Sequence, residues 1–274
     1  MALKHHSTNG LYKVIIGCFF AIWFLFIIIP FLALFSQLVN FRWGILKEST
    51  LAIRAITTSL LTTAASLIIL ALVGLPTAYL MAKSEGRLFR YAGVLLDLPM
   101  VLPPAVAGVL LMLAFGRNGL IGSFLAKKGI TITFTWFAVV LAQCFVAGPI
   151  FIKNAITGFK SIDSELEETA LTLGKSPWQV FWQVTFPLAL PSLISGLVMA
   201  WARALGEFGA TIIFAGNFPG RTQTLPLAIY VAMENNFALS MALSALMVFI
   251  SFGLLSLIQV LERHKERGGP SAAS

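Results

Sequence analysis

Six long apolar runs recur along the chain, and they constrain its fold more than any other feature. They cover approximately residues 12–39, 56–82, 94–115, 134–157, 188–213 and 238–262. Each run is long enough to cross a bilayer as a helix, which needs roughly 20 residues, and a helix satisfies its own backbone polar groups within hydrocarbon. The sequence therefore predicts an all-α polytopic membrane protein with about six transmembrane helices.

The charged composition agrees with a membrane protein. Only 11% of the residues are charged, against about 25% in soluble domains. In a soluble protein, a net charge of +8 would suggest binding to nucleic acid. In a chain made of membrane spans, the same charge favours basic cytoplasmic loops near anionic lipid. We therefore expect no nucleic-acid partner. Cys18 and Cys144 both fall in apolar runs. We therefore expect no disulfide framework and no metal site.

The first apolar run could be taken for a secretory signal. It extends from Val14 to Val39, whereas the apolar part of a signal peptide has about 7–15 residues. We therefore expect this run to be retained as the first span.

The distribution of basic residues predicts the orientation. An even number of spans puts both termini on one side, and cytoplasmic loops carry the excess of Lys and Arg. With a cytoplasmic N-terminus, the inner segments hold the larger set: Lys4, Lys13, Lys83, Arg87, Arg90, Lys153, Lys160, Lys175, Arg263, Lys265 and Arg267. The outer loops then hold the smaller set: Arg42, Lys47, Arg54, Arg117, Lys127, Lys128 and Arg221. This bias predicts that both termini are cytoplasmic.

A polar segment at about 158–187 contains "SELEETALTLGKSPWQVFWQVTFP" and carries strong helix start and stop signals. Ser164 and Glu167 match a capping box, and glutamates follow in the first turn, where the helix dipole favours negative charge. Gly174 is typical of the residue that ends a helix. The segment predicts a short helix between them, whose apolar face would hold Leu166, Ala170 and Leu173.

A second short helix is expected directly after this stop. Ser176 and Gln179 form another capping box, with Pro177 at the favoured first position, and Pro187 should interrupt the chain before the fifth span. One stripe of the second helix would hold Trp178, Phe181, Trp182 and Thr185. The two helices predict a cytoplasmic two-helix elbow with a sharp bend, although their composition is also compatible with an amphipathic hairpin lying in the membrane interface.

The spacing in this elbow resembles the signature of ABC-importer permeases, E-A-A-x3-G-x9-I-x-L-P. The chain keeps every spacing, with Thr, Val and Phe in place of Ala, Ile and Leu, at Glu168, Thr169, Ala170, Gly174, Val184, Phe186 and Pro187. The resemblance implies a fold like that of type I ABC importer permeases. In such importers this elbow, the coupling elbow, docks into a groove on a separate ATPase subunit and moves with it as ATP is hydrolysed.

The resemblance also implies roles for individual residues of the elbow. Contact with the ATPase subunit, and coupling to its movement, would involve Glu168, Thr169, Ala170, Gly174, Lys175 and Pro187. Glu168 could instead act only as a charge at the helix terminus.

The chain carries no ATP-binding motif of its own. The pattern G-x-x-x-x-G-K-[ST] is absent, because the Gly174-Lys175-Ser176 sequence would need a glycine where Thr169 stands. We therefore expect that the chain is not an enzyme and holds no cofactor, and that the partner ATPase uses ATP and Mg. His5, His6 and His264 lie near the termini, so no His, Asp and Glu constellation falls within a predicted span.

The fifth span carries a second polar cluster. Arg203 and Glu207 are four residues apart and would share one helical face within the span. An arginine at the bilayer centre costs on the order of 2.5–3.5 kcal/mol, so such residues usually face a bundle interior or a water-filled path. The pair is compatible with a self-neutralised structural contact and also with a gate on an anion path that must release its cargo.

Gly206 and Gly209 flank Glu207 in this cluster. Small residues allow helices to approach closely in lipid. These glycines would suit a face that moves against a symmetry mate beside the path, and they would equally suit simple helix packing.

Several motifs narrow the resemblance. "LPMVLPPAVAG" at 98–108, and further along "RALGEFGAT", "FAGN" and "TQTLPLAIY", look like the permeases of molybdate and tungstate importers, with sulfate permeases as close relatives. The resemblance covers most of the chain from about residue 50 onward. It implies ATP-driven import of a tetrahedral oxyanion, molybdate or tungstate first and sulfate second.

In the family that the chain resembles, a separate extracytoplasmic binding protein captures the oxyanion and delivers it. The external segment 214–237 would then offer Asn217, Arg221 and Glu234 for docking, with further charges at Arg117, Lys127 and Lys128. All of these could equally be ordinary solvated loop residues.

The same family combines two identical permease chains with two ATPase subunits. We therefore expect a two-fold homodimer with the path on its axis, in a bacterial or archaeal plasma membrane, with one transmembrane permease domain over residues 1–274. The alternative is a stand-alone secondary anion transporter or channel, which would be expected to show repeated halves; no inverted repeat is recognisable in the sequence.

Overall fold

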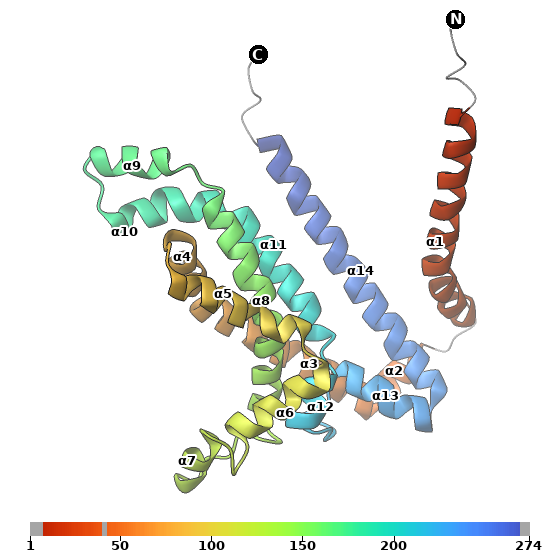
Figure 1. Cartoon of the computed structure of the whole chain (residues 1–274). Coiled ribbons are helices and arrows are strands. Elements are labelled where there is room, and N and C mark those ends of the chain that lie inside the picture. The colour runs from red at the N-terminus through yellow and green to blue at the C-terminus, as the bar shows by residue number, and fades with distance from the viewer. Residues whose placement is uncertain (1–7, 40–42, 269–274) are drawn as a thin grey trace, which may run out of the picture.

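The structure is a computed structural model that describes residues 8–39 and 43–268, with side chains described within 12–39 and 43–256. Outside the described part lie several residues named above: Lys4, His5, His6 and Arg42, and the side chains of Arg263, His264, Lys265 and Arg267. Every regular element in the described ranges is a helix (Figure 1). The predicted all-α class is confirmed.

Five helical runs among the described residues are long and apolar enough to cross a bilayer. They are α1 (Thr8–Leu38), the run of α3 (Thr50–Ile69), η1 (Leu70–Gly74) and α4 (Leu75–Lys83), α8 (Trp136–Lys160), the run of α10 (Pro177–Val180), η2 (Phe181–Thr185) and α11 (Phe186–Leu205), and α14 (Phe237–Gly268). The bent pair α5 (Arg87–Val101) and α6 (Pro104–Phe115) is a sixth candidate. These runs match the expected count of about six spans.

Shorter helices join the spans at both ends of the molecule. They are α2 (Gly44–Glu48), α7 (Gly122–Lys127), α9 (Ser164–Thr172), α12 (Gly209–Phe214) and α13 (Leu225–Asn235). The start of α1, the end of α14, and the α9–α10 elbow all lie at the upper side of Figure 1, whereas α7, α12 and α13 lie toward the opposite side. The elbow and both ends of the described chain therefore share one side.

The third predicted span is not one straight helix. α5 and α6 meet at 119°, around Leu102 and Pro103. Both residues precede a proline and are extended, with ψ of 139° and 137°, because the ring of a following proline disfavours the helical conformation. The span predicted over 94–115 is therefore a bent pair of helices, and the Pro103-Pro104 pair is the cause of the bend.

Two prolines are accommodated without a break. η1 and η2 are π-helical turns, and each ends two residues before a proline, at Gly74 before Pro76 and at Thr185 before Pro187. A proline inside an α-helix lacks the N–H of one hydrogen bond and clashes with the carbonyl four residues earlier, and a wider turn relieves both problems. The predicted interruption at Pro187 is therefore wrong, since the helical run continues from Pro177 to Leu205.

α8 forms the centre of the bundle and packs closely against α11. A Cβ placed on Gly158 would lie 2.6 Å from the Cβ of Ser192, and one on Gly196 would lie 2.8 Å from the Cβ of Asn154. Glycine at these two points lets the backbones approach, as is common between membrane helices. The buried side of α8 carries Phe151 and Phe159 at 0% and 1% exposure.

The buried face of α3 is small and polar. It presents Ala52, Ala55, Thr58, Ser59, Thr62, Thr63 and Ser66. Gln143 of α8 joins this face: its Oε1 lies 2.9 Å from Ser66 Oγ, and its Nε2 donates to Thr62 Oγ1 at 3.2 Å. Ser59 Oγ accepts the N–H of Leu225 at 2.7 Å. Side-chain hydrogen bonds therefore hold α3 to α8 and to α13, where two apolar faces would gain little from contact in lipid.

α1 stands apart from this bundle (Figure 1). Its apolar side chains are largely exposed, and it meets α14 near its end, where the rings of Phe35 and Phe249 are 5.5 Å apart. The two helices border an apolar cavity of about 840 Å³. α1 therefore makes few contacts with the rest of the described bundle.

We expect Gln143→Leu to lower the free energy of unfolding by about 1 kcal/mol, the size of a strong interhelical hydrogen bond in a membrane. The replacement removes the amide that links α3 to α8 while filling a similar volume. Unfolding by SDS in mixed micelles would measure the change.

Thr57→Val is the matched control, because the exposed Thr57 hydroxyl bonds only to the carbonyl of Ile53 on its own helix. An equal loss in both variants would contradict an interhelical role for Gln143.

Candidate functional site

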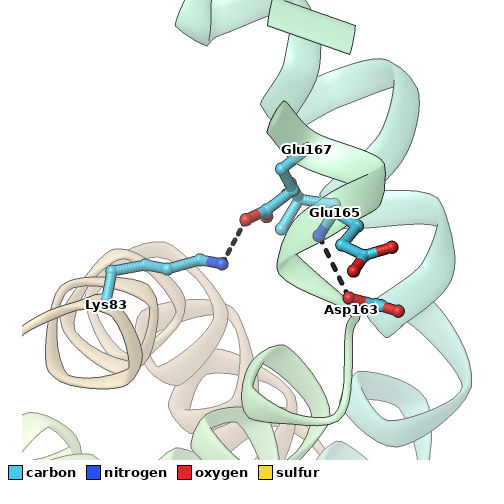
Figure 2. A network of polar contacts seen from close by, with 5 residues as sticks. Lys83, Asp163, Glu165 and Glu167 are labelled. Carbon is cyan, nitrogen blue, oxygen red and sulfur yellow. Dashed lines mark hydrogen bonds and ion pairs between the residues drawn. The ribbon is translucent and has the colours of Figure 1, made fainter. Parts of the chain in front are cut away.

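The first arm of the elbow, α9, begins one residue earlier than predicted. Asp163 is the N-cap, and its Oδ1 accepts the backbone N–H of Glu165 at 3.0 Å (Figure 2). Ser164 is already helical, so the predicted capping box of Ser164 and Glu167 is wrong. Aspartate is an equally good cap and adds the negative charge that a helix N-terminus favours, and its use leaves the Glu167 side chain for other contacts.

The bend between the two arms depends on Gly174, as predicted. Its φ is +83°, a conformation that side chains disfavour. Its N–H donates to the carbonyl of Leu171 at 2.9 Å, and the N–H of Lys175 donates to that of Ala170 at 3.2 Å, which are the two bonds of a Schellman motif. A Cβ there would meet no other group within 4 Å, so the backbone conformation alone favours glycine.

The second arm starts with the predicted capping box. Ser176 Oγ accepts the N–H of Gln179 at 3.3 Å, and Gln179 Oε1 accepts the N–H of Ser176 at 2.9 Å, with Pro177 as the first helical residue. The arm then continues through η2 into α11. The expected second short helix is therefore the beginning of the fifth span.

Most residues that the signature assigns to partner contact lie on the elbow's surface. The exposed ones are Glu168, Thr169, Gly174, Lys175 and Pro187. Ala170 is only 7% exposed and packs inward. Beside them Leu166, Leu173 and Trp178 are 51%, 76% and 70% exposed, and such clustered apolar exposure marks a surface that another protein or the membrane interface covers.

Glu167 is a residue of the elbow that the sequence reasoning missed. Its Oε2 pairs with Lys83 Nζ at the end of α4 (Figure 2). Its Oε1 accepts a hydrogen bond from Thr185 Oγ1 at 2.6 Å. The available signal was the spacing of Glu167 and Ala170, which are three residues apart and so share a face, while Glu168 points to a different one.

Arg203 and Glu207 form the predicted ion pair, with Arg203 Nη1 2.8 Å from Glu207 Oε2. The helix geometry differs from the prediction, because α11 ends at Leu205 and Glu207 follows it. Glu207 Oε1 accepts the N–H of Ala210 at 2.8 Å, and so caps the separate helix α12. The side chain of Glu207 is 1% exposed and that of Arg203 is 36% exposed, so the pair joins a buried anion to a partly accessible cation.

The two glycines beside this pair have different surroundings. A Cβ on Gly209 would overlap Pro104 at the start of α6, so this glycine lets α12 rest on the bent third span. A Cβ on Gly206 would have its nearest neighbour at 3.6 Å. For Gly209 the structure favours packing within the chain.

A second ion pair joins α5 to α8. Lys153 Nζ lies 2.7 Å from Asp97 Oδ1, with side-chain exposures of 50% and 43%. Lys153 entered the sequence reasoning only as one basic residue among many. In the described spans both Arg203 and Lys153 thus carry a carboxylate partner.

The segment from α12 through α13, which holds the residues expected to face a binding protein, lies on the side away from the elbow (Figure 1). Arg221 and Glu234 are exposed, and Asn217 is half-buried. Arg221 and Arg54 line one cavity of about 360 Å³. Arg117 and Lys127 are exposed on the α6–α7 side of the molecule, and Lys128 lies 4.8 Å from the ring centre of Phe124.

Among the described residues, no three His, Cys, Asp or Glu side chains gather in a way that could hold a metal ion. The polar features of the structure are instead an exposed bend at one end, charged pairs within the bundle and basic loops at the other end.

Comparisons with known proteins give a consistent result. The family described as "Binding-protein-dependent transport system inner membrane component" matches residues 74–267. The chain is 42% identical over 226 residues to the "Molybdenum transport system permease protein ModB" of Mycobacterium tuberculosis, covering 82% of this chain and 86% of that protein. It is 38% identical over 197 residues to the "Sulfate transport system permease protein CysW" of Synechococcus elongatus, covering 72% and 69%.

A solved structure supports the same fold. A chain from a bacterial ABC transporter involved in the import of the acidic polysaccharide alginate superposes with a TM-score of 0.70 and 17% identity, covering 94% of this chain and 96% of that one. At this identity the likeness concerns the fold alone.

We expect Arg203→Leu to lower the free energy of unfolding by about 3 kcal/mol, because it leaves the buried Glu207 carboxylate without its counter-charge. Adding Glu207→Gln should recover more than half of that loss, since a neutral amide can still accept from Ala210. SDS unfolding would measure both variants.

Arg117→Leu, in an exposed loop, should change the same free energy by less than about 0.5 kcal/mol. If the double variant is as unstable as Arg203→Leu alone, the buried charge is not the cause.

Proposed function

The chain belongs to the binding-protein-dependent transport system inner membrane components, and from this premise we propose that it is an ABC importer permease that translocates a tetrahedral oxyanion. Molybdate or tungstate is the first candidate and sulfate the second. The observation that carries the importer role is the exposed elbow with its glycine bend. The names of the relatives, a molybdenum permease and a sulfate permease, support the oxyanion.

A separate ATPase subunit drives the transport, in two copies. The exposed face of the elbow, with Glu168, Leu173 and Trp178, suits a groove on that subunit, and the second arm leads without a break into the fifth span. ATP and Mg belong to that partner. The chain's task is to convert movement of the elbow into movement of its spans.

Two copies of the chain enclose the path. A charged side chain within a span avoids lipid, so the accessible part of Arg203 is directed at the path or at the second copy. Its partner Glu207 weakens the local positive field, which favours release of an anion over tight retention. Lys153 and Asp97 repeat this pairing nearer the elbow end of α8.

The orientation follows from the elbow. A multi-pass protein of this family lies in the inner membrane, and its ATPase is cytoplasmic, so the elbow side of Figure 1 faces the cytoplasm together with both ends of the described chain. The opposite side, with Arg221, Glu234 and the half-buried Asn217, then faces the binding protein that delivers the oxyanion.

Uptake into vesicles tests the proposal. The chain would be reconstituted with its cognate ATPase and binding protein, and radiolabelled molybdate, tungstate and sulfate would be supplied. We expect uptake that requires ATP, Mg and both partners, with molybdate and tungstate preferred. Uptake by this chain alone without ATP would identify a secondary anion transporter or channel and would overturn the proposal.

Gly174→Val should uncouple the importer. A β-branched residue at φ +83° costs about 1–2 kcal/mol of local strain, so the bend should open while the spans remain folded. We expect oxyanion uptake to fall about fivefold or more, with ATP hydrolysis retained. Gly174→Asn is the control, because asparagine tolerates this conformation, and full uptake by the valine variant would remove Gly174 from the coupling path.

A further inference from the structure

The first arm of the elbow has little apolar attachment to its own chain. Ala170 is the one buried residue of α9. Leu166, Leu171 and Leu173 are 51%, 45% and 76% exposed. A nine-residue helix is marginal by itself, so its position must come from other contacts.

Glu167 supplies those contacts with both of its carboxylate oxygens. Oε2 pairs with Lys83 (Figure 2). Oε1 accepts a hydrogen bond from Thr185 Oγ1 at 2.6 Å. The Glu167 side chain is 15% exposed and that of Lys83 is 34% exposed, while Thr185 is fully buried. Hydrogen bonds with an ionised partner are about twice as strong as neutral ones. The Glu167 carboxylate accepts one such bond from a cation and one from a hydroxyl.

The two partners of Glu167 belong to different spans. Lys83 is the last residue of α4 and so ends the second span, where a cation also suits the helix dipole. Thr185 is the last residue of the π turn η2 in the fifth span. The Glu167 link, defined as Lys83, Glu167 and Thr185, therefore ties α9 to two spans at one point.

An aromatic cluster lies between the same spans. The ring of Tyr79 in α4 is 4.9 Å from that of Phe181 in η2 and 5.3 Å from that of Phe159 in α8. Ring pairs at these distances add about 0.5–1.5 kcal/mol each to packing. The Glu167 link thus fastens α9 to a region where α4, η2 and α8 are already packed together.

We propose that Glu167 is a positioning residue for coupling. It fastens the first arm of the elbow to the end of the second span as well as to the fifth span, so that movement imposed on α9 reaches both. Glu168 faces outward to the partner, whereas Glu167 faces inward to the bundle. The inference rests on the proposed function, since it assumes that an ATPase subunit moves the elbow.

The test compares oxyanion uptake per ATP hydrolysed in vesicles that hold the full complex with its binding protein. Glu167→Gln and Lys83→Gln should each lower this ratio about fivefold or more, the factor expected for one charge-assisted hydrogen bond. ATP hydrolysis and copurification of the ATPase should persist. Glu165→Gln is the matched control, because Glu165 is exposed in the same helical turn and contacts Asp163 only through its backbone.

The exchange variant Lys83→Glu with Glu167→Lys provides the decisive readout. It restores an ion pair with reversed polarity, so it should recover most of the uptake per ATP that the single variants lose. If each residue acted only locally, the exchange would not recover this ratio. Thr185→Ser keeps the hydroxyl and should keep the ratio, whereas Thr185→Val should lower it. If Glu167→Gln does not accumulate in the membrane, the Thr185 pair carries the test.

Two results would overturn the proposal. One is an unchanged ratio in Glu167→Gln; the other is loss of ATPase copurification in Glu167→Gln that the exchange variant does not restore, which would make Glu167 a direct contact of the ATPase. Failure of the unmodified complex to transport with ATP would instead reject the proposed function, so the two failures are distinguishable.

Discussion

A polar group inside a bilayer has no water to bond, so it must find its partner within the protein, and much of this structure follows from that constraint. The buried hydroxyls of α3 meet Gln143 and the backbone of Leu225. Glu207 meets Arg203 on one side and caps α12 on the other. The same polar contacts that make the helices compatible with lipid also decide which helices lie together.

The constraint also shapes how the chain handles charge. Arg203 and Lys153 each have a carboxylate within 2.8 Å, so neither presents an uncompensated positive field. An anion passing such groups would be attracted weakly and released easily. Tight recognition of the oxyanion is then better left to a soluble partner, which agrees with a permease that receives its cargo from a binding protein.

Much of the fold could be predicted because its signals are local. The length of the apolar runs predicted the spans, and the Gly174 stop and the Ser176 capping box predicted the elbow. The spacing around these residues indicated the family that the comparisons confirm. The 119° angle of the bend around Leu102 could not be predicted from hydropathy, because hydropathy averages over the Pro103-Pro104 pair. The end of the α11 helix at Leu205 was not predicted, because hydropathy also averages over the residues that follow it. Gly206 and Gly209 nevertheless disfavour a continuous helix there.

The spacing of Glu167 and Ala170 indicates that Glu167 faces inward, but the partners of its carboxylate could not be predicted from local signals. Its partner Lys83 is 84 residues away in sequence, and nothing near either residue indicates that the end of the second span lies beside the elbow. Asp97 and Lys153 present the same difficulty, since a pair between separate helices depends on how the bundle packs. Tertiary contacts of this kind determine how the elbow is attached to the bundle, whereas the sequence already specifies its local shape.

The π turns have a consequence for how the spans present their side chains. One residue corresponds to about 100° of rotation about a helix axis, and a π turn takes in one residue more than an α turn. The predicted stripe from Trp178 to Thr185 is divided for this reason: Trp178 is 70% exposed and Thr185 is fully buried. In the second and fifth spans, the segments before and after the π turn therefore present their side chains in directions that are set separately. Insertion or deletion of a single residue at η1 or η2 would redirect half of a span while leaving its length and apolar character almost unchanged.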